Sequence, residues 1–328
     1  MGNVKDTGAA AHEADRLAWP LRVPTPGGAR LLPERMGRVK RLFLPLFFLC
    51  TVPGLACDRS TGAGTAEPRA PTPRLHLETT VVQGPASGTV LHAMVEDVVL
   101  EESSVLRRTD DLWTTEAGDA MAVRVAWHVE FVPHAGGRTG VALSAELQAR
   151  RRGALPAPPT AAAAFLLEAR EDEVRRARIR EQARAIVHRL DEQARIRLGD
   201  DAIVLDAVGS SDRALRGVAV DEVRERRLQS AIPSLVDRLR ALDVEAEPRD
   251  AAELLAILGA LVRLGATDGA AEVIAALPVS DPALLQSAIP GLARLGGPEV
   301  GAFLQVLATG HDSAIVRELA RERLADMR

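Results

Sequence analysis

The sequence predicts two folded domains, a small α+β domain followed by an all-α domain. Two observations lead to this prediction. Apolar and polar residues alternate along three segments between residues 75 and 149, and apolar residues recur every three or four positions over most of the chain after residue 168. The chain has 328 residues, 47% apolar and 26% charged, which is ordinary for a soluble globular protein of about two domains.

The α+β domain is predicted to span residues 74–200, with the element order strand, helix, strand, strand, helix. Residues 75–81 alternate between apolar and polar side chains, which predicts the first strand. A helix is expected over residues 90–100, where apolar residues recur at helical spacing after a candidate cap at Ser87 or Thr89. This order is typical of a helix pair packed on an antiparallel sheet.

Residues 121–131 give the clearest strand prediction, because their apolar face consists largely of β-branched and aromatic side chains. Residues 133–140 are rich in turn formers and lead to a second alternating run over residues 141–149, so a hairpin is expected. Residues 153–164 are rich in Pro and Ala and are expected to form a loop. The apolar spacing over residues 168–198 then predicts a long amphipathic helix.

The second domain, residues 201–328, contains an internal repeat. Residues 259–265 (GALVRLG) are echoed by residues 290–296 (PGLARLG), at an offset of 31 residues. Self-similarity at a fixed offset is the mark of a repeat array, and each unit here has the pattern helix, turn, helix. The expected helices cover residues 251–264, 269–277, 282–295, 298–307 and 313–325.

This repeat resembles the short bacterial form of the HEAT repeat, through its Asp-Pro-Ala or Asp-Ser-Ala helix starts and its Leu-Gly turns. The resemblance implies a solenoid of stacked helix pairs that bury their apolar stripes against one another. Asp250, Asp281 and Asp312 align at the helix starts and are expected to be N-caps. Four leucines are expected to face neighbouring helices and two arginines to recur on one side: Leu261, Leu264, Leu292, Leu295, Arg263 and Arg294.

Residues 36–57 have the layout of a secretory signal peptide. A short basic stretch, residues 36–41, precedes an apolar run from Leu42 to Ala56 that two prolines interrupt. A membrane-spanning helix needs about 20 apolar residues, so this run is too short and too broken to span a bilayer. The sequence therefore predicts an exported protein.

The end of this segment resembles the signal of bacterial lipoproteins. Gly54, Leu55 and Ala56 precede Cys57, and Ala56 is the small residue that the lipoprotein pattern has before its cysteine. Gly54 departs from the leucine-like residue usual at its position. The resemblance implies that the Cys57 thiol carries a lipid that anchors the protein to the inner or outer membrane of the bacterial envelope, facing the periplasm. An ordinary secretory signal followed by an incidental cysteine is the alternative.

The residues on either side of this signal have no predicted fold. Residues 1–35 do not belong to a signal that begins at Met36, so they are either a leader or a segment read from a start codon set too far upstream, at Met1. Residues 58–73 are rich in Gly, Ala, Thr and Pro and show no periodicity. Such a composition predicts a flexible tether between the anchor and the first domain.

The charge of the chain argues against a nucleic-acid partner. The formal net charge is −4, and the residues after Cys57 carry −8. Binding to phosphates requires an excess of basic side chains, and single-strand binders also stack bases on aromatic rings. Since only 3% of the residues are aromatic, no nucleic-acid role is expected.

No residue pattern in the chain predicts catalysis, a cofactor or a metal site. The histidines are scattered, whereas a metal site needs three or four converging ligands. The run Ser210-Ser211-Asp212 is expected to cap a helix and not to supply a nucleophile.

We therefore expect a lipid-anchored envelope protein that binds an unidentified protein partner through its helical array and is not an enzyme. An enzyme or small-molecule carrier, with a pocket on the α+β domain near Trp113, Trp127 and His128, is the alternative.

Overall fold

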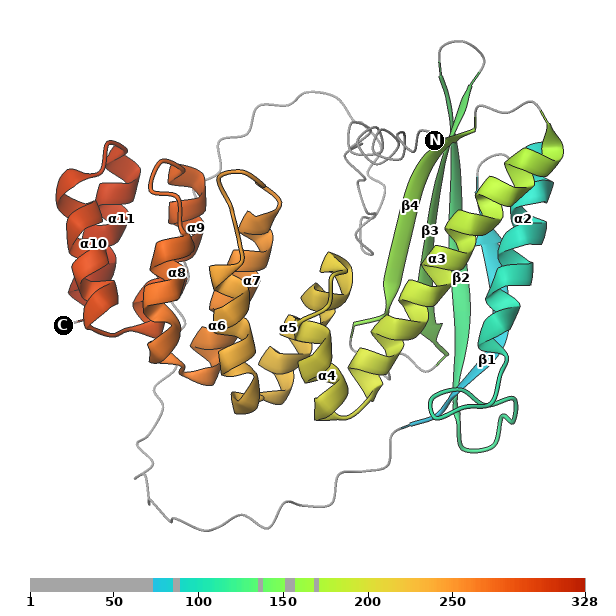
Figure 1. The fold of residues 1–328 in the computed structure, drawn as a ribbon, viewed down its shortest axis with the longest axis horizontal. Coiled ribbons are helices and arrows are strands. Elements are labelled where there is room, and N and C mark those ends of the chain that lie inside the picture. Colours follow the sequence, from blue (N-terminus) through green and yellow to red (C-terminus); the bar gives the residue numbers. More distant parts are fainter. Residues whose placement is uncertain (1–72, 85–88, 135–137, 151–156, 168–170, 328) are drawn as a thin grey trace, which may run out of the picture. The chain divides into compact units, whose positions relative to one another are not determined.

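The computed structural model describes residues 73–84, 89–134, 138–150, 157–167 and 171–327 (Figure 1). The predicted leader, signal peptide and nearly all of the tether lie outside the described residues. The same holds for Gly54, Leu55, Ala56 and the predicted lipid site Cys57, so the fold below concerns the part of the chain that follows them.

Four strands form one mixed sheet in the order β1-β2-β3-β4 (Figure 1). They are β1 (Leu75–Gln83), β2 (Met121–Pro133), β3 (Thr139–Ala149) and β4 (Thr160–Leu167). β2, β3 and β4 pair antiparallel, and the predicted hairpin joins β2 to β3. The expectation of an antiparallel sheet is wrong at β1, which pairs with β2 in parallel. The helix α2 (Val90–Ser103) and the loop after it carry the chain back to the end of the sheet where β1 began.

The strand β4 lies where the sequence predicts a loop. Its sequence, TAAAAFLL, lacks the alternation that marks a strand, and alanine has low strand propensity. Pairing with β3 overrides this local preference, with Ala161 opposite Ala145 and Phe165 opposite Val141. The predicted element order therefore gains a fourth strand, whereas the predicted fold class, α+β followed by all-α, is confirmed.

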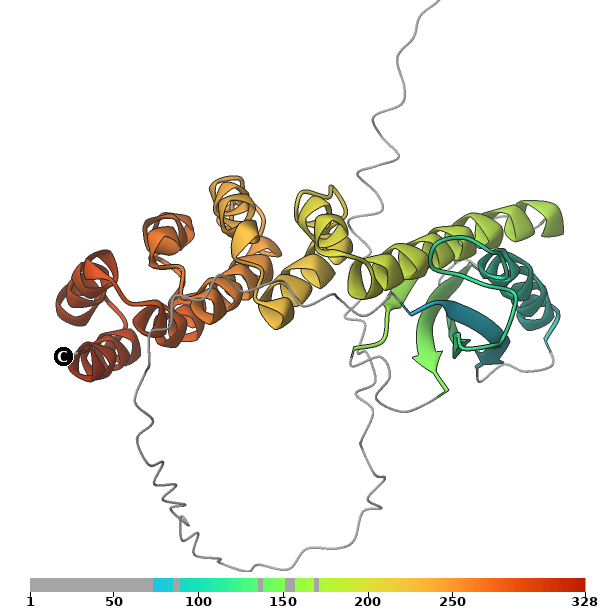
Figure 2. The same cartoon turned by 90° about the horizontal axis from the view of Figure 1, so that it is seen from below.

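Two helices cover one face of the sheet (Figure 2). The predicted cap of α2 is correct at Thr89, whose hydroxyl accepts a hydrogen bond from the His92 amide at 3.1 Å. The long helix α3 (Asp172–Leu198) packs beside α2 and against β3 and β4. Buried aliphatic side chains such as Val98 and Ile186 fill the space between these helices and the sheet. The opposite face of the sheet is covered by no described element (Figure 2).

Eight further helices follow α3 in the described chain. They are α4 (Asp201–Val208), α5 (Arg213–Arg226), α6 (Ile232–Arg240), α7 (Asp250–Leu264), α8 (Ala270–Ala276), α9 (Pro282–Leu295), α10 (Pro298–Gly310) and α11 (Ala314–Asp326). Contacts run from α3 to α5, α7, α9 and α11 in one layer, and from α4 to α6, α8 and α10 in the other. The helix α3 therefore joins the sheet region to the helical region. Its residues contribute to both apolar cores, with Ala194 in the core of the sheet region and Ile196 in that of the helical region.

The leucines predicted to face neighbouring helices are buried, with Leu261 and Leu292 fully so. The three aligned aspartates behave differently from one another. Asp281 caps α9 as predicted and accepts hydrogen bonds from the amides of residues 283 and 284. Asp250 lies inside α7 and pairs with Arg213, and α11 starts after Ser313 with no side-chain cap from Asp312. Within the described ranges, every helix is too short or too polar to span a bilayer.

Candidate functional site

The alternative site predicted on the α+β domain is not assembled as expected. Trp127 points into the core between the sheet and α2, where its Nε1 donates to the Ser103 hydroxyl at 2.9 Å. His128 follows it on β2 and is exposed on the uncovered face. Because neighbouring residues of a strand point to opposite faces, the two side chains cannot line one pocket. Trp113 is also buried, and its Nε1 donates to Asp191 at 2.6 Å.

The described histidines are dispersed over the fold. No group of three His, Cys, Asp or Glu residues that could hold a metal ion occurs within the described residues. His188 pairs with Glu192 one turn away on α3, at 3.2 Å. His311 bridges two loops of the array, since its Nδ1 accepts from the Ser313 amide at 3.0 Å and its Nε2 lies 3.0 Å from the Val279 carbonyl. These contacts are structural, and they place no two histidines together.

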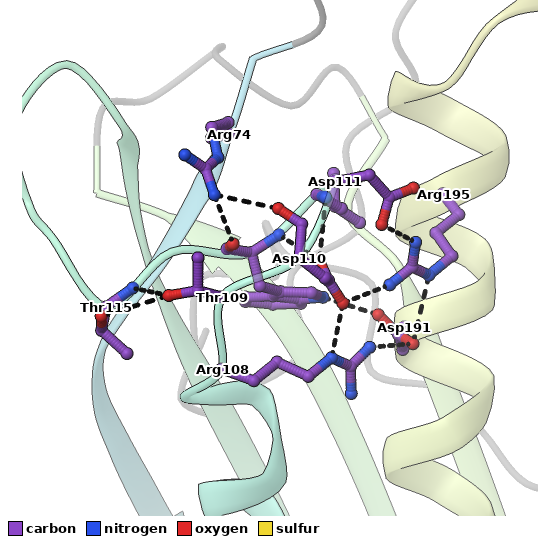
Figure 3. A network of polar contacts seen from close by, with 10 residues as sticks. Arg74, Arg108, Thr109, Asp110, Asp111, Thr115, Asp191 and Arg195 are labelled. Carbon is purple, nitrogen blue, oxygen red and sulfur yellow. Dashed lines mark hydrogen bonds and ion pairs between the residues drawn. The ribbon is translucent and has the colours of Figure 1, made fainter.

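A cluster of charged side chains clamps the loop before β2 onto α3 (Figure 3). Asp110 accepts hydrogen bonds from the Leu112 and Trp113 amides at 2.9 and 2.7 Å. Arg108 donates to Asp110 and to Asp191 of α3, at 2.7 and 2.6 Å. Arg195, one turn after Asp191, donates to Asp110 at 2.8 Å. The loop is therefore tied to the helix by two arginines and two carboxylates that share partners.

The electrostatics of this clamp keep the Asp110 carboxylate ionised. Burial by itself raises the pKa of Asp110, but hydrogen bonds from the Trp113 amide and the Arg108 guanidinium outweigh it, so the pKa lies well below its usual range. A carboxyl group with so low a pKa holds no proton near neutral pH. Asp110 is thus suited to hold the loop in place and unsuited to exchange protons with a substrate.

A second cluster lies inside the helical array, where α5, α6 and α7 meet. Glu253 of α7 is 7% exposed and accepts two hydrogen bonds from Arg216 of α5, both at 2.8 Å. Arg238 of α6 donates to the same carboxylate at 2.6 Å. Burial raises the pKa of Glu253, but the bonds from Arg216 and Arg238 outweigh it and lower the pKa to about 2. This carboxylate therefore joins three helices as a permanent anion.

A third cluster fixes the point at which α3 passes into the array. Arg226 of α5 donates to the carbonyl oxygens of Ile196, Arg197 and Gly199 at the end of α3, at 2.8–2.9 Å. Those carbonyls lack partners within the helix, and a guanidinium group satisfies them while opposing the negative end of the helix dipole. Glu222 in turn accepts from Arg226 at 2.9 Å.

Sequence reasoning missed all three clusters. Except for a few contacts within one helix or loop, the paired residues belong to different elements and are separated by 15 to 85 residues in the sequence. Spacing along one helix therefore does not reveal them. The one feature of the sequence that pointed to such clusters is the high number of arginines in α3 and α5, which need acidic partners when they are partly buried.

The array also exposes a repeated surface on the layer that contains α7 and α9. We call it the small-residue face, because short side chains recur there at spacings of four and three: Ala252, Ala256 and Gly259 on α7, and Ala283, Ser287 and Pro290 on α9. They are exposed or half-buried. The next residue along each face is an exposed arginine, Arg263 on α7 and Arg294 on α9, as the sequence predicts. Neither arginine has an ion-pair or hydrogen-bond partner among the described residues.

One hollow of about 430 Å³ lies beside α3, at the start of α5. Its charged groups already have partners, since Arg184 bonds Glu102 at 3.1 Å and Arg189 bonds Asp212 at 2.9 Å. Pairing of this kind leaves no converging free polar groups for a small molecule.

Comparisons with known proteins give this chain no family. No protein family and no curated protein matches the sequence. One solved structure with some similarity is a minor lipoprotein from Acinetobacter baumannii, which is 16% identical over 36% of this chain and 89% of that chain, with a TM-score of 0.20.

Proposed function

We propose that this protein is a lipid-anchored protein of the bacterial cell envelope that faces the periplasm and binds another protein through its helical array, without catalysis. The sequence pattern before Cys57 supports the anchor, with its basic start, its short apolar run and the small residue Ala56. A lipid on Cys57 would hold the two domains at a membrane through the tether of residues 58–73.

The array itself supports the binding role. Its two layers of helices and its offset of 31 residues favour the HEAT-like solenoid that the sequence predicts, and such arrays bind partners over extended surfaces. The observation that carries the proposal is the small-residue face. Short side chains allow the backbone of a partner to approach closely. The exposed side chains of Arg263 and Arg294 lie beside them and have no ion-pair or hydrogen-bond partner among the described residues.

This surface favours a partner with carboxylates. Two guanidinium groups one repeat apart would each form a bidentate pair with an Asp or Glu of the bound protein, which fixes its register along the array. Desolvated arginines near the centre of an interface are frequent hot spots, so these two residues should dominate the affinity.

Two experiments in the cells that make the protein test the two parts of this proposal. We expect the chain to incorporate a labelled fatty acid, and a Cys57→Ser variant to lose the label. We expect chemical crosslinking to yield one specific complex that a Arg263→Glu, Arg294→Glu double variant reduces at least tenfold. The control is Val306→Glu on α10, in the other helical layer, where an exposed side chain gains a negative charge; this variant should leave the complex unchanged. An unlabelled chain would overturn the anchor, and equal complex yields from all variants would overturn the binding face.

A further inference from the structure

The two edges of the sheet differ in how they are protected from pairing with another chain. At the β1 edge, the Leu75 amide donates to the Leu112 carbonyl at 2.7 Å and the Thr114 amide donates to the Leu75 carbonyl at 2.8 Å. The register of β1 is irregular between Leu77 and Thr79, and the charged Glu78 lies there and pairs with Arg150. A covering loop, a bulge and a charge are devices by which natural sheets block their edges.

The β4 edge carries none of these devices over most of its length. The Leu147 amide donates to the Pro159 carbonyl at 2.9 Å, which fixes the alternation of hydrogen bonds along β3 and β4. Odd-numbered residues of β4 therefore bond to β3, while Thr160, Ala162, Ala164 and Leu166 direct their amides and carbonyls away from the sheet. Residues 161–167 include no charge, no proline and no break in register.

Only the first of these four outward positions has a partner in the described part of the chain. The Gln193 side chain of α3, 3% exposed, accepts from the Thr160 amide and donates to the Thr160 carbonyl, both at 2.9 Å. A primary amide that accepts and donates in this way occupies the position of a peptide group in an adjacent strand. At Thr160, the Gln193 side chain therefore makes the hydrogen bonds that a fifth strand would make. Further along β4, Ala162 and Ala164 are exposed.

We propose that the β4 edge, residues 162–166, binds an extended segment of another protein, which adds to the sheet as a fifth strand. The ligand is a peptide backbone, because the edge presents alternating backbone amides and carbonyls and no charged side chain. The side chains of β4 beside it are short or apolar, so an uncharged segment is preferred. This surface is independent of the lipid anchor and of the small-residue face.

A single strand fits this edge better than a second copy of the chain. An antiparallel pair of β4 strands, centred on Ala164, would place both helix layers on the same face of one continuous sheet. The helix α3 lies against β4 and reaches the edge through Gln193. Adjacent strands are about 4.8 Å apart, whereas packed helices need about 8–10 Å between their axes, so two copies of α3 would crowd one another.

Photocrosslinking of the full chain in the cells that make it tests this proposal. A photoreactive amino acid replaces Ala162, Ala164 or Leu166 in turn, and the crosslinked residue of the partner is mapped by mass spectrometry. We expect the three positions to react with one segment of one other protein, at residues that step by two as the probe steps by two. The same probe at Ser144, on the uncovered face of β3 opposite Ala162, is the control and should give no such product.

Every other result overturns the proposal. Absence of crosslinks to another polypeptide would show that the edge is unoccupied, and crosslinks to a second copy would show self-association. Contacts without the two-residue step, or an equal yield from Ser144, would show docking on a face and not on the edge.

Proline substitution provides a second readout that separates binding from folding. An Ala164→Pro change removes an amide that points outward, so the pairing of β3 with β4 keeps its hydrogen bonds. We expect this variant to melt at an unchanged temperature and to reduce crosslinking from position 162 at least tenfold. Ala163→Pro, which removes an amide bonded to β3, should instead lower the melting temperature. An undiminished crosslink in folded Ala164→Pro protein would contradict strand addition.

Discussion

The helices α7 and α9 derive from sequences offset by 31 residues, yet they fill the same position of the repeat in opposite ways. Glu253 in α7 corresponds to Leu284 in α9, and the two residues are 7% and 5% exposed. Leu284 joins the apolar core. Glu253 remains charged because Arg216 and Arg238 surround its carboxylate. The comparison shows that a buried position can be occupied in two ways, by an apolar side chain or by a charge whose partners surround it.

The two solutions differ in what they connect. The arginines that hold Glu253 come from α5 and α6, so this carboxylate ties one helix pair to the next by directed bonds. Leu284 makes only van der Waals contacts, which do not depend on direction. Its neighbours could therefore repack around another apolar side chain of similar size. The first repeat is thus the more sensitive of the two to charge and to pH.

The largest expected effect comes from removing the charge of Glu253. In a Glu253→Gln variant, arginines of α5 and α6 lose their anion while the shape of the side chain is retained. We expect the free energy of unfolding at pH 7 to fall by about 3 kcal/mol, the usual range for breaking a buried ion pair. Denaturant titration followed by circular dichroism measures this change.

The effect of that variant depends on pH. The pKa of Glu253 is about 2 in the folded protein and 4.5 for the free side chain. A lowered pKa stabilises the fold above about pH 4.5, and this stabilisation disappears as the pH falls toward about 2. The loss in Glu253→Gln should therefore be smaller at pH 3 than at pH 7. The control Leu284→Ala should lose about 2–4 kcal/mol at both values; an equal loss at both values from Glu253→Gln would contradict the assigned role.

The helices α7 to α11 could be predicted because each has a local signature. The predicted bounds of α9, residues 282–295, are those observed, since Asp281 and Pro282 mark its start and Gly296 follows its end. The role of Glu253 could not be predicted in this way. Its partners lie 37 and 15 residues away, and in sequence an acidic residue near the start of a helix has the pattern of a solvated side chain.

The sheet shows the same limit of local information. β2 and β3 were predictable because apolar residues recur at every second position along them, and in β2 these residues are largely β-branched or aromatic. The segment 160–167 forms the strand β4 because its backbone pairs with β3, not because of its own residue pattern. The parallel pairing of β1 with β2 depends on the path of α2 and the loop after it, which local sequence does not reveal. The predicted lipid site, Cys57, lies outside the described residues. Arg263 and Arg294, which were expected only to recur on one side of the repeat, do lie at equivalent exposed positions.

A smaller effect is expected where the repeats differ by one methyl group. Ala260 in α7 corresponds to Gly291 in α9, and a Cβ at Gly291 would lie 2.8 Å from Cδ2 of the buried Leu258. We expect Gly291→Ala to lower the free energy of unfolding by about 1 kcal/mol, because the cost of moving Leu258 within a packed core, about 2 kcal/mol, exceeds the gain of about 1 kcal/mol that alanine has over glycine in a helix.

The control is Gly259→Ala on the small-residue face, where an added Cβ meets nothing within 4 Å. Alanine favours a helix over glycine by about 1 kcal/mol, so this variant should be more stable than the wild type. Thermal unfolding of the two variants measures the difference. If both shift the melting temperature in the same direction, the close approach of α7 and α9 at Gly291 is not as described.

The smallest effect sharpens the comparison of the helix starts. Asp281→Ala should lower the free energy of unfolding by about 1 kcal/mol, because two amides at the start of α9 lose their acceptor, while Asp281→Asn should retain most of the stability. Asp312 occupies the aligned position one repeat later, but among the described residues its side chain accepts no hydrogen bond from an amide at the start of α11. Asp312→Ala should therefore change stability by less than about 0.5 kcal/mol. Equal losses at the two aspartates would mean that the alignment, and not the local hydrogen bonding, decides which residue caps its helix.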